Sequence, residues 1–287
     1  MTGDGDRPVS DPRTALLTHL RLAAATFGAE FPLPVAGALP PALAAPADAA
    51  PDPGAAPAAA EPPSFSGPAV DPGFEEYDEE PPEPVVLPPL ELPEDLAGQR
   101  AVAVRCRRCK LCETRTQVVF GEGAADADVM FVGEAPGARE DEQGRPFVGP
   151  AGQLLNRILE NAMGLERDAV YIANVNKCRP PGNRNPEPDE IGACLPYLQA
   201  QIRAIRPRVL VTLGRVAAHN LLGTDLSMTR LRGRDLEYDG IPVVATWHPA
   251  YLLRNPAAKR ETWEDVKRVN RILGRPEDPR QSPSPRP

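Results

Sequence analysis

Five cysteines are the first residues in this chain whose type and spacing indicate chemistry. Cys106 and Cys109 form a Cys-x-x-Cys pair and Cys112 follows in the same phase, whereas Cys178 lies 69 positions beyond Cys109 and Cys194 another 16 beyond that. A set of thiolates without histidine suits zinc or an iron–sulfur cluster. Zinc sites are usually built from two close pairs, and only one is present, so the spacing favours a cluster. Zinc and free thiols stay open, as does a ligand set of Cys106, Cys109 and Cys112 with one distant cysteine.

A glycine-rich segment with carboxylates follows a predicted strand. It reads Gly-Glu-Ala-Pro-Gly over residues 133–137, continues with Glu140 and Asp141, and ends with Gly-Arg-Pro-Phe-Val-Gly over residues 144–149. Glycines allow a backbone to approach a ligand closely, and a proline stiffens the turn. The segment is therefore a candidate binding loop, and an ordinary strand-to-helix connection is the alternative.

Histidine and asparagine follow two other predicted strands. The chain has three histidines, and His248 comes directly after a strand and before a proline that restricts the backbone. A lone histidine is more often structural than catalytic, but its position at the end of a strand favours a functional role. Asn174 opens the segment Asn-x-x-Lys-Cys-Arg-Pro-Pro, which also contains Cys178.

The hydrophobic periodicity predicts alternating strands and helices. Buried strands are expected at 129–132, 170–173, 209–213 and 243–246, and helices at 153–163, 189–205, 215–222 and 259–273, the second with an internal Pro196 that could bend or break it. This alternation predicts an α/β fold with a parallel sheet covered on both faces. Ligands of such sheets bind outside the carboxyl ends of the strands, where residues 133–141, 174–178 and 248–255 should meet.

Charge and composition divide the chain. Residues 1–95 contain 17 acidic and three basic residues, and residues 96–287 contain 23 acidic and 29 basic ones. We predict a disordered Pro/Ala-rich acidic extension over 1–95 with a short helix at 11–27, a folded domain over 96–274, and a disordered tail over 275–287. The acidic run of the extension is a solvated spacer, a binding site for a protein partner or a mimic of nucleic acid, and a spacer is the favoured interpretation. A mildly basic domain suits a polyanion such as nucleic acid, although ordinary surface charge explains it equally well.

Two classes of protein are not expected from the sequence. No run of about 18 apolar residues is present, which argues against a membrane protein. The acidic N-terminus lacks the basic and apolar regions of a signal peptide, so we expect a cytoplasmic location.

The motifs together resemble those of the iron–sulfur (family 4) uracil-DNA glycosylases. The resemblance covers roughly residues 100–273 and rests on four motifs in the same order, which are Gly-Glu-Ala-Pro-Gly with the trailing Glu-Asp, Gly-Arg-Pro-Phe-Val-Gly, Asn-x-x-Lys-Cys-Arg-Pro-Pro and His-Pro-Ala-Tyr-Leu-Leu-Arg-Asn-Pro. It implies a three-layer α/β/α sandwich around a four-stranded parallel sheet. It also implies a [4Fe–4S] cluster held by Cys106, Cys109, Cys178 and Cys194, with Cys112 as a spare cysteine.

The resemblance also implies a reaction and roles for the remaining residues. The enzyme would flip uracil out of single- or double-stranded DNA and hydrolyse its N-glycosidic bond, acting as a monomer in base excision repair. Phe147 would stack on the base, Asn174 would read its polar edge, and His248 would donate a hydrogen bond to O2. The other pocket residues would be Glu134, Ala135, Gly137 and Glu140.

Two assignments are less specific. Ala135 occupies the position where classical uracil glycosylases carry a water-orienting Asp, so that role falls to Glu134, to Glu140 or to backbone carbonyls. Leu252 or Leu253 would fill the gap left by the flipped base, or pack in the core, and Arg254 would contact a phosphate.

Two other functions are compatible with the sequence. One is a glycosylase for another deaminated base, and the other is a non-catalytic DNA-binding module with a structural cluster. A relative that bonds covalently to the abasic sugar is disfavoured, because residues 144–149 run without the insertion that carries its nucleophilic histidine.

Overall fold

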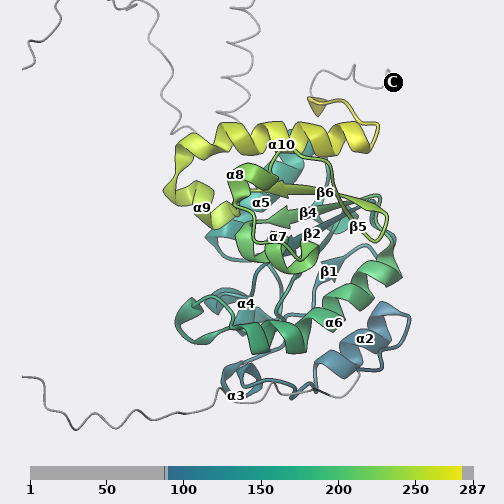
Figure 1. Ribbon diagram of the computed structural model, residues 1–287, viewed down its shortest axis with the longest axis vertical. Coiled ribbons are helices and arrows are strands. Elements are labelled where there is room, and N and C mark those ends of the chain that lie inside the picture. The colour runs from purple at the N-terminus through teal and green to yellow at the C-terminus, as the bar shows by residue number, and fades with distance from the viewer. Residues whose placement is uncertain (1–86, 88–89, 280–287) are drawn as a thin grey trace, which may run out of the picture. The chain divides into compact units, whose positions relative to one another are not determined.

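The computed structural model describes residues 87 and 90–279 of the chain. The helix expected at 11–27, most of the acidic extension and residues 280–287 lie outside this described part. None of the helices within it is long and apolar enough to cross a membrane. The described residues form an α/β fold around one sheet (Figure 1).

The sheet has six strands in the order β1-β3-β2-β4-β6-β5. The four central strands, β3, β2, β4 and β6, pair in parallel, and the outer strands β1 and β5 pair antiparallel to β3 and β6. The strands are β1 (Glu122–Gly123), β2 (Val129–Gly133), β3 (Tyr171–Asn174), β4 (Val209–Leu213), β5 (Leu236–Tyr238) and β6 (Ile241–Thr246).

The expected four-stranded parallel sheet is thus the centre of a larger, mixed sheet, and the expected strand number was wrong. The two added strands are only two and three residues long, too short to give a clear alternating pattern. β5 joins β6 through Asp239 and Gly240, both with positive φ, 50° and 77°. An Asp-Gly pair is a typical two-residue hairpin signal, so the sequence contained a sign of this strand.

Helices cover both faces of the sheet (Figure 1). The helices longer than one turn at their described bounds are α2 (Leu96–Ala103), α4 (Ala138–Gln143), α5 (Pro150–Ile158), α6 (Pro188–Ile205), α7 (Arg215–Leu222), α9 (Pro249–Arg254) and α10 (Lys259–Ile272). Two one-turn helices, α3 (Leu111–Thr114) and α8 (Met228–Leu231), and short 3₁₀ or π segments complete the fold. The described domain therefore has the three layers that the sequence predicted.

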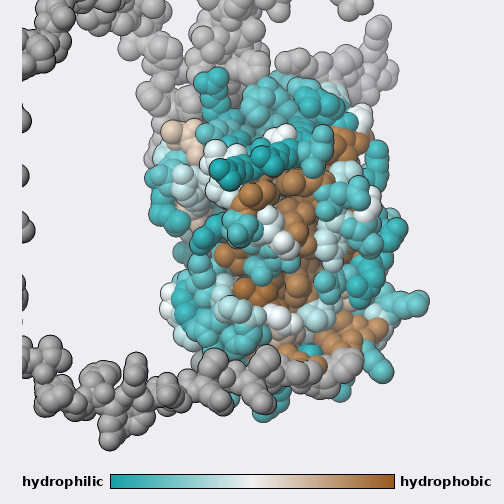
Figure 2. Space-filling model, in the orientation of Figure 1, coloured by the Kyte–Doolittle hydropathy of each residue, from teal (hydrophilic) through white to brown (hydrophobic). Residues whose placement is uncertain are grey.

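Alternate residues of the central strands point to opposite layers. On one face, Phe131 and Val211 pack in a cluster with residues of α5 and α10, such as Leu155 and Val266. On the other face, neighbouring strand residues such as Met130 and Leu210 pack with residues of α6 and α7. All residues of β2, β3 and β4 are buried, as expected for parallel strands covered on both sides. The outward surface of α10 is hydrophilic (Figure 2).

Two helices differ locally from their predicted form. The helix expected at 153–163 begins earlier, at Pro150, because Gly149 precedes it in extended conformation and proline suits a first turn. It ends in a π-helical turn over Leu159–Met163 before Gly164. α6 continues through Pro196 as one helix, and a capping box between Glu187 and Glu190 fixes its start.

Candidate active site and cysteine cluster

A cleft lies at the carboxyl ends of the parallel strands. Its volume is about 450 Å³, within the range of sites that bind small ligands. Its lining comes from the end of β3 and from the segments that follow β2, β3 and β6. The predicted pocket residues that line it are Glu134, Ala135, Gly137, Glu140, Phe147, Asn174, His248 and Arg254.

Asn174 and Phe147 meet at the floor of this cleft. Asn174 is 1% exposed, and its side-chain Oδ1 has no hydrogen-bond partner among the described residues. Gly133 makes room for both side chains, because a methyl group built on it would lie 2.4 Å from Asn174 Oδ1 and 2.6 Å from the Phe147 ring. A buried acceptor without a partner is costly, so its position in a cleft indicates a ligand that donates a hydrogen bond.

His248 is held as a neutral donor. Its Nδ1 accepts a hydrogen bond of 3.1 Å from the backbone N–H of Ala250, which leaves the ring proton on Nε2. Burial, together with the charge of Arg254, lowers the pKa of His248 to about 4. The imidazole is therefore uncharged at neutral pH, and its ring lies 5.6 Å from that of Phe147.

The two pocket glutamates differ in their environment. One oxygen of Glu140 accepts hydrogen bonds from the backbone N–H groups of Val148 and Gly149, at 2.9 and 2.8 Å. That oxygen therefore holds the loop after Phe147 and is not free to act as a base. No described backbone N–H group makes such a contact with the Glu134 carboxylate, and burial raises the pKa of Glu134 above the ordinary value while Arg215 opposes the shift.

Only one of the two leucines proposed to fill the gap left by a flipped base is accessible. Leu252 is fully buried in the core between the sheet and α5, so its assignment as a DNA contact was wrong. Leu253 is 43% exposed, and Arg254 next to it lines the cleft. The helical turn of α9 directs adjacent residues to different sides, which explains the difference.

Three residues that the sequence analysis gave no role help to shape the cleft. Tyr251 lines it and stacks on Trp247, with ring centroids 4.8 Å apart. Lys177 is buried and donates to the Asn174 carbonyl and to Gln201 Oε1, at 2.7 and 2.6 Å. Gly214 has a φ of +87°, and a methyl group built on it would lie 2.9 Å from His248 Cβ. The sequence did contain a signal for Lys177, which is a charged residue inside a motif at the end of a strand. The roles of Tyr251 and Gly214 depend on contacts between distant segments, which the sequence does not show.

All five cysteines line a second cavity, separate from the cleft. Three come from the segment around α3, Cys178 follows β3, and Cys194 lies on α6. Among the described residues, no three Cys, His, Asp or Glu side chains are arranged to hold a single metal ion. Cys112 lies at the same cavity as the four predicted ligands, so position alone does not separate it from them.

Two of the cysteine sulfurs accept hydrogen bonds from N–H groups. Arg115 Nη1 donates to Cys178 Sγ at 3.2 Å, and the backbone N–H of Lys177 donates to Cys194 Sγ at 3.1 Å. Hydrogen bonds to sulfur of this kind surround the ligands of iron–sulfur clusters. Burial raises the pKa of Cys109 to about 11 and that of Cys194 to about 12, so metal binding at these thiols would release their protons. The donor set and its N–H partners therefore fit an all-thiolate cluster.

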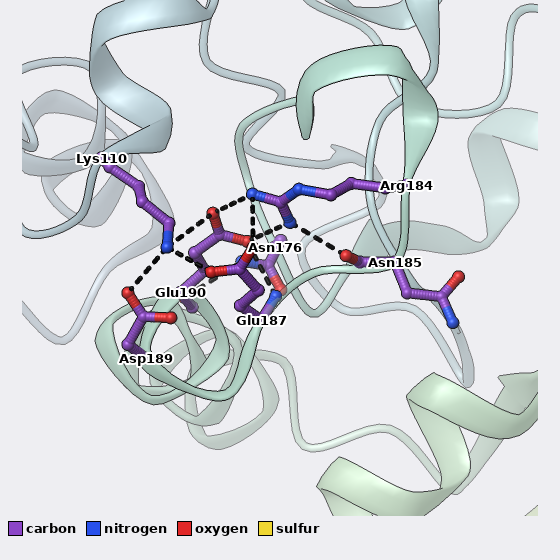
Figure 3. A network of polar contacts seen from close by, with 7 residues as sticks. All are labelled: Lys110, Asn176, Arg184, Asn185, Glu187, Asp189 and Glu190. Carbon is purple, nitrogen blue, oxygen red and sulfur yellow. Dashed lines mark hydrogen bonds and ion pairs between the residues drawn. The ribbon is translucent and has the colours of Figure 1, made fainter. Parts of the chain in front are cut away.

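A polar network connects the cysteine segment to the rim of the cleft (Figure 3). The buried carboxylate of Glu190 accepts two hydrogen bonds from Arg184, at 2.8 and 2.6 Å, and these bonds hold the pKa of Glu190 below its ordinary value. Arg184 and Asn185 line the cleft. Lys110, which lies between Cys109 and Cys112 in the sequence, pairs with Glu187 at the start of helix α6. The first turn of α6 thus contacts both regions.

The fold and the cleft define a class of protein. A parallel sheet with Asn174, Phe147 and His248 at its carboxyl ends is the arrangement that the motifs predicted, and residues 120–267 match the family model described as the uracil DNA glycosylase superfamily. The chain belongs to this superfamily.

Comparison with curated proteins specifies the branch. The chain is 47% identical over 177 residues to the Type-4 uracil-DNA glycosylase of Sulfurisphaera tokodaii, a match that covers 59% of this chain and 80% of that protein. It is 45% identical over 173 residues to the Type-4 enzyme of Thermotoga maritima, with 59% and 90% covered. A Type-5 uracil-DNA glycosylase of Pyrobaculum aerophilum is 33% identical over 166 residues, with 52% and 72% covered. Within the superfamily, the chain is a member of the type-4 family.

Proposed function

We propose that this protein excises uracil from DNA, leaving an abasic site for base excision repair. The observation that carries the proposal is the buried Asn174, whose side-chain oxygen has no partner among the residues that the structure describes and lies in the same cleft as Phe147 and His248. A duplex hides the glycosidic bond, so the nucleotide enters this cleft flipped out of the stack or from single-stranded DNA.

Recognition of the base follows from two side chains. The Phe147 ring provides an apolar face on which the flipped uracil stacks. Asn174 offers a donor and an acceptor in one amide, and so pairs with O4 and N3–H of uracil and opposes the reversed pattern of cytosine. Glu140, close to Gly137, forms the wall against the C5 methyl group of thymine.

His248 stabilises the leaving group. Cleavage of the glycosidic bond places negative charge on uracil, and a donor aimed at O2 stabilises that charge more in the transition state than in the ground state. The Ala250 contact fixes the proton on Nε2, and the pKa of about 4 for His248 keeps the ring neutral. A neutral donor does not lose its proton to the base, so it acts throughout the reaction as a hydrogen-bond partner.

Glu134 orients the attacking water. It is the pocket carboxylate that is not held by the loop after Phe147, and it follows β2 directly. As a carboxylate it accepts a hydrogen bond from water and favours attack on the positively charged sugar that bond cleavage leaves.

A [4Fe–4S] cluster would be held by Cys106, Cys109, Cys178 and Cys194. A zinc ion needs four ligands around one point, whereas each cysteine of a cluster binds a different iron, which suits thiols spread around a cavity. The bound cluster supplies a structural cross-link between the α3 segment, the loop after β3 and α6. No step of base excision is assigned to it.

DNA binding involves the rim of the cleft. Arg254 contacts a phosphate, and Leu253 enters the stack where the base has left it, because its side chain is exposed beside the cleft. We expect binding to weaken with salt, as for any protein that pairs cationic side chains with phosphates. We also propose that the protein acts in the cytoplasm and as a monomer.

The test is release of free uracil from an oligonucleotide by anaerobically purified protein, with the visible spectrum and iron content of the same sample. Oligonucleotides that carry thymine, cytosine or hypoxanthine at the same position are the controls. Release of uracil alone supports the proposal. A protein that contains iron and binds DNA but releases no uracil would contradict it.

A further inference from the structure

The backbone of the stacking residue is strained. Phe147 has a φ of +51°, in the left-handed region that residues other than glycine seldom adopt. Such a conformation persists only where the surrounding structure holds it, and it is often found at functional sites. The contacts on either side of Phe147 therefore decide where its ring lies.

Arg167 holds the residue before Phe147. Its Nη2 donates to the carbonyl oxygen of Pro146 at 2.5 Å, and its Nη1 donates to Asn156 Oδ1 at 2.8 Å. Glu122, from β1, orients the guanidinium through Oε1, which accepts from Nε and Nη2 at 2.8 and 2.6 Å. The Arg167 side chain is 16% exposed, so solvent competes little for these bonds. A planar guanidinium with all three nitrogens engaged fixes the position of the carbonyl that it contacts.

Two further contacts hold Phe147 and the residues after it. Glu140 accepts from the backbone N–H groups of Val148 and Gly149. Gly152 lies against Phe147 itself, since a methyl group built on it would be 1.8 Å from the Phe147 carbonyl oxygen. The strained residue is thus fixed between Arg167 on one side and Glu140 on the other.

We infer that Arg167, oriented by Glu122, is a positioning residue that holds the Phe147 ring in place to stack on the flipped base. Arg167 does not line the cleft, so it acts through the loop and not on the substrate. The inference rests on the proposed function, because it assigns the ring its role in base binding. A preorganised ring lets the base stack without first ordering the loop, and so the effect is expected on substrate binding.

Arg145 provides a matched control. It pairs with the same Glu122, through its Nε at 2.7 Å, but no contact joins it to the Pro146 carbonyl. It is also more exposed than Arg167, at 56%. If the effect came only from neutralising Glu122, Arg145→Met and Arg167→Met would behave alike.

The experiment is a double-mutant cycle on uracil release with the full chain. Arg167→Met should raise KM and lower kcat/KM about tenfold, with Arg167→Lys between it and the wild type and Arg145→Met within twofold of the wild type. In a Phe147→Ala background, the same Arg167→Met change should cost less than twofold, because the ring that Arg167 positions is gone. Additive losses, or equal losses for the two arginines, would overturn the inference.

Folding is checked on the same samples. Thermal midpoint and iron content are measured for each variant, and Glu122→Gln replaces Arg167→Met if the latter does not fold. Glu122→Gln should show the same dependence on Phe147, and independence from Phe147 would also overturn the inference. Wild-type protein without uracil release would instead contradict the proposed function, so the two failures are distinct.

Discussion

The cleft at the strand ends and the cysteine cavity lie in one domain but differ in how their polar atoms are satisfied. The cleft is open, with about 450 Å³ of space, and within the described part of the chain the buried side-chain oxygen of Asn174 in it has no partner. At the cysteine cavity, in contrast, the sulfurs of Cys178 and Cys194 already accept N–H groups of the protein. The cleft thus offers an unused acceptor to a ligand, whereas two of the five sulfurs at the cavity are already held by donors of the protein.

The strongest test of this comparison is the loss of the donor in the cleft. His248→Ala should lower kcat by a factor of about 10²–10³, the usual cost of removing one such donor, while DNA binding persists. His219→Gln is the control, because His219, on α7, bonds the carbonyl oxygen of Leu226 and does not line the cleft. Single-turnover excision and DNA titration measure the two quantities, and near-normal excision by the alanine variant would remove His248 from the mechanism.

Substitution of a cysteine at the cavity should affect the stability of the protein before it affects the excision reaction. Cys194→Ala should lose iron and the absorption near roughly 400 nm expected of all-thiolate ligation, and lower the thermal midpoint. Cys112→Ala should retain both. Iron analysis and thermal unfolding under anaerobic conditions check this. Loss of iron from the Cys112 variant would show that the fifth cysteine is a ligand.

The two adjacent leucines separate packing from DNA contact. Leu252→Ala should lower the free energy of unfolding by about 2–5 kcal/mol, because Leu252 is fully buried. Leu253→Ala should change it by less than about 0.5 kcal/mol. We expect Leu253→Ala to reduce kcat/KM on double-stranded DNA only, since single-stranded DNA leaves no gap to fill. Equal losses of kcat/KM on double- and single-stranded DNA would argue against a role of Leu253 in filling the gap.

The smallest expected effect concerns pH. If Glu134 orients water as a carboxylate, kcat should fall as the pH drops through its pKa, which burial raises above 4.5. His248 contributes no step near its ordinary value of 6.5, because its pKa is about 4 and the ring is neutral at higher pH. A pH profile of kcat for the wild type and Glu134→Gln measures this. An acidic limb that survives in the glutamine variant would assign it to another group.

Much of the fold and the cleft could be predicted because the relevant signals are local. Strand β4 and helix α7 have the predicted bounds. A short apolar run defines the strand, and Gly214 after it marks the end of the strand and the start of the helix. Glu134, Asn174 and His248 were found because they lie at or just after the ends of parallel strands, which must meet, whereas Phe147, Glu140 and Arg254 were found from the motif resemblance. The short edge strands could not be found in this way, because two or three residues carry no periodicity.

The sequence by itself determined which chemical groups this protein has and which strand end carries each. Only the tertiary structure decided how they are used. Leu252 is buried and Leu253 exposed because of the turn of one short helix, and Glu140 holds backbone N–H groups because the chain folds back beside it. Arg167 lies 20 positions after Phe147 and matches no motif, yet it contacts the carbonyl before that residue. Such contacts depend on how distant segments pack, and no periodicity or spacing in the sequence encodes them.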